Sequence, residues 1–222
     1  PLATMILGEM GAHVIKVEEP GRGDESRSFP PILDGGVSGY YSSLNRSKQS
    51  ITVNLKQPAG LDLVRKLAAD SDVLVENFTP GVAARLGLGF DEIRALRPDI
   101  VYCSISGFGQ TGPLRNRKGY DPVLQAMGGL MGVTGEKGGG PIKSMVPIAD
   151  LSAGMFGAQC ILAALYAKAT TGVGQHIDLA MFDVMVSMLS TVGTNYLNTG
   201  VVPPRSGTEN PTRVPSAAFR CK

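Results

Sequence analysis

The side chain best placed for covalent chemistry is Asp150, at the start of the longest helical pattern in the sequence. Unpaired backbone N–H groups and the positive end of a helix would hold such a carboxylate ionised. Aspartate is also a preferred helix cap, and most aspartates at helix starts only cap. Here the small residues 152–154 follow it and the glycine-rich residues 135–140 precede it. Because a nucleophile needs access and a cap does not, this open setting favours a nucleophilic carboxylate.

Other catalytic side chains are scarce. The two histidines, His13 and His176, both fall in predicted strands and are interpreted as structural. No Gly-x-Ser-x-Gly elbow occurs, and no serine or cysteine has an obvious activating base, which argues against a hydrolase. Histidines, cysteines and carboxylates show no ligand spacing, so no metal is expected. Cys103, Cys160 and Cys221 form no paired framework and are expected to be reduced.

A glycine-rich segment, GFGQTG at residues 107–112, matches the dinucleotide fingerprint GxGxxG and follows a predicted strand. A functional fingerprint opens a helix whose N-terminus holds the pyrophosphate, whereas residues 113–117 continue as polar loop. We therefore expect no NAD site, and a nucleotide-binding oxidoreductase domain that uses this segment remains the rival in another class. Glu18, at the end of a predicted strand, could imitate a ribose-binding acid, but the glycine spacing before it fits a helix-to-strand turn better.

Composition places the chain among ordinary globular proteins. Hydrophobic residues make up 43% and charged residues 18% of its 222 residues, enough apolar side chains for a packed core. The net charge of +2 comes from scattered charges without a Lys/Arg run, so nucleic acid is not expected as a partner. No stretch approaches the roughly 18 apolar residues of a membrane span, and no membrane is expected either. We expect a soluble protein of the cytoplasm, or of the mitochondrial matrix in a eukaryote, whose first residues begin in the middle of a fold.

The secondary-structure pattern alternates short β-rich runs with helical ones. Predicted strands cover residues 13–18, 50–55, 73–76, 100–106 and 175–181. Predicted helices cover residues 61–69, 92–96, 147–171 and 182–197. This alternation predicts an α/β fold with a doubly wound, mostly parallel sheet. Residues 1–197 are assigned to this domain, and residues 198–222, rich in turn formers, are predicted to be a linker that leaves it.

Several motifs occur in a definite order along nearly the whole chain. They are residues 3–8 with 11–18, 45–50, 75–81, 119–121 and 149–151. In this order they resemble the family III CoA-transferases (the CaiB/BaiF family), which include formyl-CoA and carnitine CoA-transferases. The resemblance implies a Rossmann-like large domain of a homodimer that is interlocked in this family. It also implies that the family's first strand and its C-terminal small domain lie outside this chain.

By this resemblance Asp150 corresponds to the family's nucleophile, and Tyr120 and Asp121 to active-site positions beside it. The implied reaction moves CoA from an acyl-CoA to a carboxylic acid through an aspartyl anhydride and an aspartyl-CoA thioester on Asp150, without a metal or NAD. The α-methylacyl-CoA racemases resemble the same fold but place a catalytic histidine in this region, and none occurs here. The transferase is therefore favoured, and the racemase remains the alternative within the fold.

The resemblance also implies a set of coenzyme A contacts. They are Val53, Lys56, Asn77, Phe78, Arg85, Leu86, Lys118 and Met181. The alternative interpretation is a solvated surface for the basic residues and core packing for the apolar ones. Glu19 departs from the pattern, because some members carry a basic residue there for a CoA phosphate. The acceptor is expected to be a dicarboxylate such as succinate, glutarate or hydroxymethylglutarate, which needs a cation for its distal carboxylate. Candidate cations are Arg115, Arg117, Lys143, Arg205 and Arg213.

Overall fold

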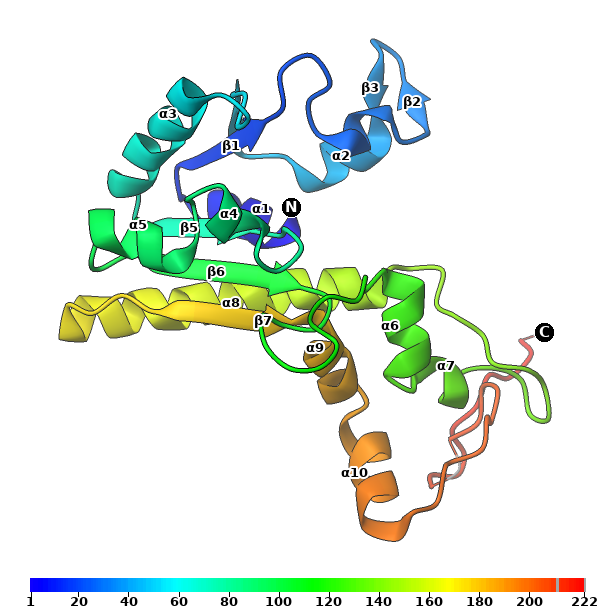
Figure 1. Cartoon of the computed structure of the whole chain (residues 1–222). Coiled ribbons are helices and arrows are strands. Elements are labelled where there is room, and N and C mark those ends of the chain that lie inside the picture. The colour runs from blue at the N-terminus through cyan, green and yellow to red at the C-terminus, as the bar shows by residue number, and fades with distance from the viewer. Residues whose placement is uncertain (211, 222) are drawn as a thin grey trace.

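Parallel strands form the centre of the protein, seen in a computed structural model that describes residues 1–210 and 212–221 (Figure 1). One sheet has the strand order β5 (Val73–Glu76), β6 (Val101–Ser106), β7 (His176–Ala180). A second sheet pairs β1 (Val14–Glu18) with β4 (Lys48–Thr52). All these pairs are parallel, whereas a small hairpin of β2 (Ile32–Leu33) and β3 (Val37–Ser38) is antiparallel. Parallel neighbours need long crossover connections, and helices supply most of them here.

Helices cover and connect the strands. In chain order they are α1 (Leu2–Glu9), the 3₁₀ helix η1 (Glu25–Ser28), α2 (Gly39–Leu44), α3 (Pro58–Ala69), α4 (Val82–Arg85), α5 (Phe90–Leu96), α6 (Asp121–Met127), α7 (Leu130–Val133), α8 (Ile148–Thr171), α9 (Met181–Met188) and α10 (Ser190–Thr199). Proline is the first residue of α3, where its missing N–H costs no hydrogen bond. The helix α8 ends at Gly172, whose φ of 72° is the left-handed conformation that stops a helix.

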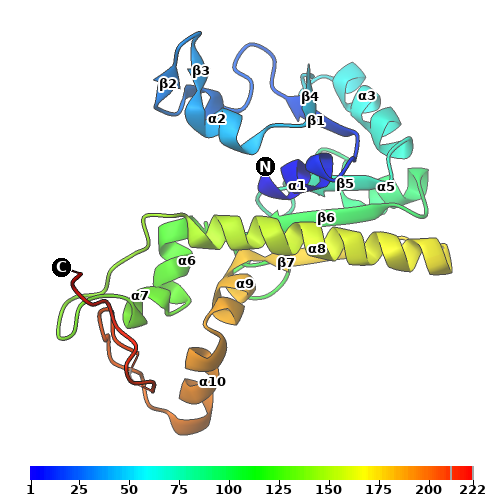
Figure 2. The same ribbon diagram turned by 180° about the vertical axis from the view of Figure 1, so that it is seen from behind.

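Each face of the three-stranded sheet has its own hydrophobic core, because successive residues of β6 point to opposite faces. Cys103 packs with Ala158 of α8 and with residues of α1. Tyr102, its neighbour, packs on the other face with Ile93 of α5 and Ala68 of α3. Figure 2 shows α8 running along the first of these faces. Parallel strands with helices on both faces confirm the predicted α/β class.

The helices α1, α2, α4, α6 and α7 and the hairpin β2–β3 have no counterpart among the predicted elements, and other elements differ in bounds or grouping. The predicted strand 50–55 is observed as β4, which begins two residues earlier and ends three residues earlier. The predicted helix 182–197 is two helices, α9 and α10, because Ser190 takes a left-handed φ of 47° at the junction. The predicted single sheet is divided into the β1–β4 pair and the three-stranded sheet.

The helix α8 corrects one expectation about membranes. Within the described part of the chain it is the one helix long and apolar enough to cross a bilayer, with 24 residues and a mean hydropathy of 1.6 over its best window. Of that window, 44% is buried inside the protein, where α8 packs against α1, α9 and β6. Much of its hydropathy comes from alanines dispersed among other residues, which is why no long apolar run stands out in the sequence. The core helix of a globular domain has this same character.

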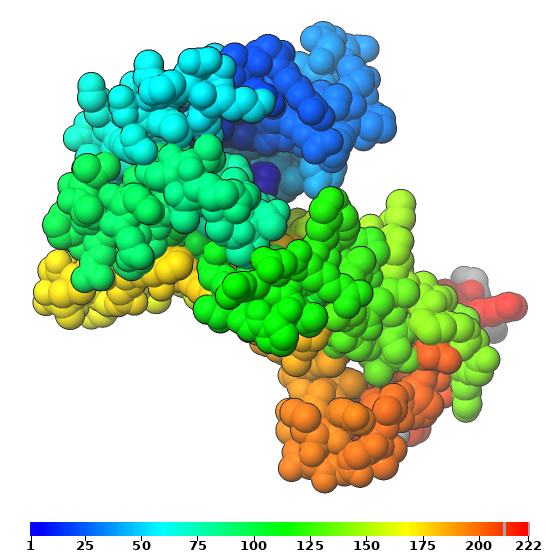
Figure 3. Space-filling model, in the orientation of Figure 1, coloured from blue at the N-terminus to red at the C-terminus, as the bar shows by residue number. Residues whose placement is uncertain are grey.

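The segment after α10 packs back onto the loop that precedes α8. Arg205 Nε donates to the carbonyl of Gly139 at 2.9 Å, and its Nη1 donates to that of Gly132 at 3.0 Å. The N–H of Gly207 adds a bond of 3.0 Å to the carbonyl of Gly135. Figure 3 shows this segment, in orange and red, lying against the light green loop. The assignment of residues 198–222 as an interdomain linker stays a prediction.

Candidate active site

Several of the residues predicted to bind CoA lie just past the carboxyl ends of strands, where open parallel sheets hold their ligands. Val53 and Lys56 follow β4, and Asn77 and Phe78 follow β5. The loop 107–120 follows β6 and leads into α6, while Met181 directly follows β7. The parallel register therefore gathers segments that are far apart in the sequence.

Asp150 is the third residue of α8, and its side chain is exposed to solvent. The residue at the helix cap is Pro147, and no side chain of α8 itself makes a capping hydrogen bond. The alternative interpretation, in which Asp150 only caps its helix, is therefore wrong. Its carboxylate is free of the backbone and can be reached from outside, as a nucleophile requires.

Asp121 takes over the capping role from a different helix. It is the first residue of α6, and its Oδ1 accepts hydrogen bonds from the N–H groups of Ala149 at 2.8 Å and Asp150 at 3.4 Å. These are two of the backbone donors that a helix start leaves without an intrahelical partner. Asp121 thus holds the entrance of α8 beside α6 and brings a second carboxylate next to Asp150.

Two glycines set the position of Asp121 at the end of β6. Gly107 follows the strand and Gly119 stands two residues before Asp121. A Cβ added to Gly119 would lie 2.6 Å from the Cα of Gly107, so the two backbones touch and only glycine fits. Tyr120, between Gly119 and Asp121, precedes α6 with its side chain 63% exposed, directed to the solvent rather than the core.

The electrostatics of Asp150 differ from the sequence-based expectation. Partial desolvation of its carboxyl group at the start of α8, and then the neighbouring charge of Asp121, raise the pKa of Asp150 from 3.8 to about 6. The prediction that the helix end holds Asp150 firmly ionised is therefore wrong in direction. The physical reasons are that the Asp150 carboxyl group is partly desolvated and that it feels the like charge of Asp121, while the first N–H groups of α8 bond to Asp121 and not to Asp150.

Tyr40 is a neighbour of Asp150 that the sequence did not reveal. It lies in α2, its ring 40% exposed and packed edge-on against Phe29 at 5.4 Å between centroids. Burial and the charges of Asp150, Asp24 and Asp121 together raise the pKa of its hydroxyl. Tyrosine in a six-residue helix carries no sequence signal of this kind, and only the fold brings α2 near the entrance of α8.

Glu18 also has a role that sequence reasoning missed. Its carboxylate, with 2% of the side chain exposed, accepts two bonds from Arg27 at 2.7 and 2.8 Å. Three further donors are the Tyr41 hydroxyl, the Ser50 hydroxyl and the backbone N–H of Asp24. The hydrogen bonds from the Arg27 guanidinium are the largest of the effects that hold the pKa of Glu18 well below its usual range. Glu18 therefore fastens the segment after β1 to α2 and β4, and is not a free ribose-binding acid.

The segment 107–112 builds no dinucleotide site of the fingerprint type. After β6 the chain runs through loop to Asp121 before the next helix begins, which confirms the expected polar loop. The N–H of Gln110 donates to both oxygens of Asp178 in β7 at 3.0 Å, so the segment is tied to its own sheet. No helix N-terminus is available there for a pyrophosphate.

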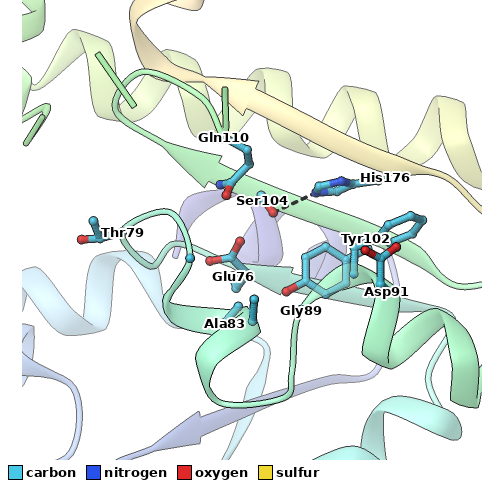
Figure 4. Close-up of a pocket in the computed structure, with 12 residues that line it drawn as sticks. Glu76, Thr79, Ala83, Gly89, Asp91, Tyr102, Ser104, Gln110 and His176 are labelled. Atoms are coloured by element: carbon cyan, nitrogen blue, oxygen red, sulfur yellow. Dashed lines mark hydrogen bonds between the residues drawn. The ribbon is translucent and has the colours of Figure 1, made fainter. Parts of the chain in front are cut away.

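A cavity of about 210 Å³ lies on the sheet face that carries Tyr102, opposite α8 (Figure 4). Its polar lining includes Glu76, Ser104, Gln110 and His176. The His176 ring stacks on Phe90 at 4.8 Å, and its Nε2 hydrogen-bonds to the Ser104 hydroxyl at 3.0 Å. His176 is exposed to this cavity, and its structural role stays a prediction that these two contacts support.

His13 makes a bond of 2.8 Å to Gln49 at the protein surface, so both histidines have partners other than the acids near α8. In the described part of the chain, no group of three or more histidines, cysteines and carboxylates is arranged to hold a metal ion.

Comparison with known proteins identifies the family and the fold. The family model described as CoA-transferase family III matches residues 1–222. The chain belongs to this family. A solved structure of a CaiB/BaiF family protein from Brucella suis superposes with a TM-score of 0.93 and 42% identity, covering 98% of this chain and 58% of that one.

Two curated relatives show the chemistry found among family III members. The chain is 45% identical over 222 residues to succinyl-CoA:glutarate CoA-transferase of Homo sapiens, and covers 51% of that protein. It is 40% identical over 223 residues to acetyl-CoA:oxalate CoA-transferase of Acetobacter aceti, and covers 57% of it. The chain spans about half the length of the curated relatives it matches.

The apolar residues expected to line CoA in family III are mostly packed inside. Val53 is 5% and Met181 8% exposed, and Met181 belongs to the core beside Ala149 and Leu124. Leu86 is half-buried against the Tyr102 core. Val53 and Met181 thus lie in the hydrophobic interior and Leu86 at its edge, and the contact of all three with CoA stays a prediction.

The other residues expected to contact CoA, four polar ones and Phe78, lie at the surface. The Lys56 side chain is 82% exposed, and its Nζ forms an ion pair with Glu19 at 3.3 Å. Glu19 is the residue that departs from the family pattern, and it already neutralises this lysine. Asn77 donates its side-chain N–H to the carbonyl of Ile105, while the Phe78 ring is 39% exposed. Arg85 and Lys118 are exposed as well.

The five cations considered for a distal carboxylate fall into two groups. Arg205 is committed to the carbonyls of Gly132 and Gly139 and is partly buried. The other four are exposed: Arg115, Arg117, Lys143 and Arg213. Arg115 and Arg117 lie in the loop between β6 and α6, a few residues before Asp121 in the sequence.

Proposed function

We propose that the full-length protein is a CoA-transferase that moves coenzyme A from an acyl-CoA to a carboxylic acid, with Asp150 as the nucleophile. One observation carries the proposal: in a chain of family III, the Asp150 carboxylate is exposed at the start of α8 and makes no capping hydrogen bond to the helix backbone. A pKa of about 6 leaves most of this carboxylate ionised at pH 7 and makes it more basic than an ordinary aspartate.

The first half-reaction loads CoA onto the protein. The Asp150 carboxylate attacks the thioester carbonyl of the donor, the C–S bond breaks, and a mixed anhydride and CoA thiolate form. The thiolate then attacks the aspartyl carbonyl of this anhydride. The donor acid leaves with one oxygen of Asp150, and an aspartyl-CoA thioester remains.

The second half-reaction repeats these steps in the other direction. The acceptor carboxylate attacks the aspartyl thioester, and a second anhydride and CoA thiolate form. The thiolate attacks the acceptor's carbonyl, which yields the new acyl-CoA and returns a carboxylate on Asp150 with one oxygen from the acceptor. One thioester replaces another, so the reaction needs neither ATP nor a metal, and the protein has mainly to exclude water and keep the thiolate close.

The neighbours of Asp150 take supporting roles in this proposal. Asp121 holds the start of α8 through its backbone N–H groups. Tyr120 and Tyr40 flank the entrance, one from the start of α6 and one from α2. The proposed CoA contacts are those named from the family resemblance: Val53, Lys56, Asn77, Phe78, Arg85, Leu86, Lys118 and Met181.

The acceptor is proposed to be a dicarboxylate. The names of several relatives support this substrate class, among them succinate–glutarate CoA-transferase of Agrobacterium fabrum, 42% identical over 221 residues. A guanidinium can hold the distal carboxylate through two parallel hydrogen bonds, and Arg115 and Arg117 are exposed and uncommitted to backbone. Lys143 and Arg213 are the further candidates.

A homodimer in the cytoplasm or the mitochondrial matrix is the proposed working form. Exposed apolar side chains along α8 support an assembly that covers them: Met155 is 44%, Leu162 39% and Tyr166 75% exposed. The remainder of the longer protein could cover the same helix, so the test is the mass of the full-length protein in solution. Light scattering should give two chains per particle, and a monomer would refute the dimer.

The nucleophile is tested by trapping. Full-length protein incubated with succinyl-CoA and then with hydroxylamine should carry a hydroxamate on the peptide that contains Asp150, because hydroxylamine cleaves thioesters and anhydrides. Asp150→Ala should show neither the hydroxamate nor transfer of CoA to glutarate, while Asp183→Asn, at an exposed position in α9, serves as the matched control. Transfer at the normal rate by Asp150→Ala would refute the proposal.

A further inference from the structure

A buried glutamine links the entrance of α8 to the loop before it. Gln125 of α6 is 0% exposed, which is unusual for a polar side chain. Its Nε2 donates to Asp121 Oδ2 at 2.6 Å, and its Oε1 accepts from the backbone N–H of Ser144 at 2.8 Å. The other oxygen of Asp121 accepts from the N–H groups of Ala149 and Asp150. One continuous chain of hydrogen bonds thus runs from the loop to the proposed nucleophile.

The partners leave only one orientation for this amide. An ionised carboxylate can only accept, so the NH₂ group of Gln125 has to face Asp121. A backbone N–H can only donate, so the amide oxygen has to face Ser144. Each of the two groups therefore has a partner of the right kind, and the chain cannot be reversed without a change of residue.

We propose that Gln125 is a positioning residue, which locks Asp121 against the start of α8 and couples the Asp150 carboxylate to the position of the loop 134–147. This inference rests on the proposed function of Asp150. Asp121 is the middle of the chain, because each of its two oxygens accepts from N–H groups of the protein. Nothing about Gln125 stands out in the sequence, where it is one polar residue in an otherwise apolar stretch.

The loop has few other fixed points, so the bond to Ser144 matters for it. The N–H of Ile142 bonds to the carbonyl of Thr134 at 3.1 Å, and Arg205 holds the carbonyl of Gly139. In the stretch from Ile142 to Pro147, one backbone N–H donates to a side chain within the described residues. It is the N–H of Ser144, and the acceptor is the amide oxygen of Gln125. Displacement of the loop would release Gln125, then Asp121, and then the N–H groups at Asp150.

The inference is tested by exchanging the two side chains of the pair. In Gln125→Glu and in Asp121→Asn, two acceptors or two donors face each other at 2.6 Å, so each single variant breaks the bond. In the double variant the asparagine donates to the glutamate, and the bonds to Ala149 and Ser144 can both form. Assayed as full-length protein at pH 8, each single variant is expected to lose roughly 10- to 100-fold in kcat for CoA transfer, with less than about threefold change in KM for the acyl-CoA. The double variant is expected to recover at least tenfold over the weaker single variant.

A second measurement follows the chain of hydrogen bonds without relying on turnover. Hydrogen exchange of the peptide spanning residues 141–152 should be at least tenfold faster in Gln125→Leu than in the wild type, at a temperature where both are folded. Gln175→Leu is the matched control, because Gln175 is exposed at the amino end of β7 and its side chain makes no hydrogen bond among the described residues. Its exchange in that peptide should equal that of the wild type.

The outcomes separate this inference from the proposed function. If the wild type transfers CoA and the single variants keep its kcat, or if the double variant recovers nothing, the role of Gln125 is refuted while Asp150 stands. Unchanged exchange in Gln125→Leu would also refute it. If Asp150→Ala transfers CoA normally, the proposed function fails, and the exchange data alone then decide whether Gln125 couples the loop to α8.

Discussion

Replacing Asp150 by asparagine should make the protein more stable at the same time as it removes activity. The folded-state pKa of Asp150 is raised from 3.8 to about 6, first by burial and then by the charge of Asp121. A raised pKa means that the folded state holds the proton more tightly than the unfolded state. The stability that this proton contributes is complete below about pH 3.8, and it is lost as the pH rises to about 6. At pH 8 the wild type therefore carries the full cost of the charge.

The size of this cost follows from three terms. The rise from 3.8 to about 6 corresponds nominally to about 3 kcal/mol. Because Asp150 is exposed, solvent screening reduces the effect, and we halve it to about 1.5 kcal/mol. A negative charge in the first turn of a helix is favourable by about 0.5 kcal/mol, which asparagine loses. Asp150→Asn should thus raise the free energy of unfolding by about 1 kcal/mol at pH 8 and change it little at pH 4.

The assay is urea unfolding of the full-length wild type and variant at both pH values. Asp34→Asn is the matched control, because Asp34 lies exposed in the turn between β2 and β3 and should show no such gain. A variant less stable than the wild type at pH 8 would contradict the reasoning. So would an equal gain at pH 4, because the gain would then not come from the charge.

Three further substitutions test other parts of the structure. Glu18→Gln should lower the free energy of unfolding by about 3 kcal/mol, because it removes the buried charge that Arg27 and three other groups contact; a loss below about 1 kcal/mol in urea unfolding would contradict this. Glu19→Ala should tighten CoA binding about two- to threefold in calorimetry, since it frees Lys56, and weaker binding would refute that competition. Gly119→Ala should lower kcat at least tenfold, because its Cβ would lie 2.6 Å from the backbone of Gly107; an unchanged kcat would show that this contact does not set Asp121.

The main elements could be predicted from the sequence because their signals are local. The run 73–76 consists of three apolar residues, two of them β-branched valines, followed by Glu76, and it appears as β5 with the same bounds. The long helix begins after Pro147 and stops at Gly172, as the capping residues indicate. The break between α9 and α10 has no such marker, since Ser190 adopts its left-handed conformation without a glycine or proline nearby in the junction.

The position of Asp150 was accessible to sequence reasoning, and its electrostatics were not. A helix start can be recognised from its own residues, but the capping group came from Asp121, 29 positions away in the chain. The same holds for Gln125 and Tyr40, whose roles depend on which helices the fold brings together. Long-range pairing of this kind leaves no periodicity or motif in a single sequence.

The central claim is that the Asp150 carboxylate itself takes part in bond making, and isotope transfer tests it most directly. Full-length protein that turns over succinyl-CoA with glutarate labelled with ¹⁸O in its carboxyl groups should return one labelled oxygen to Asp150 in each cycle. Mass spectrometry of the peptide containing Asp150 is then expected to show label that accumulates with turnover and is absent from all other peptides. Complete transfer of CoA with no label in that peptide would contradict the account.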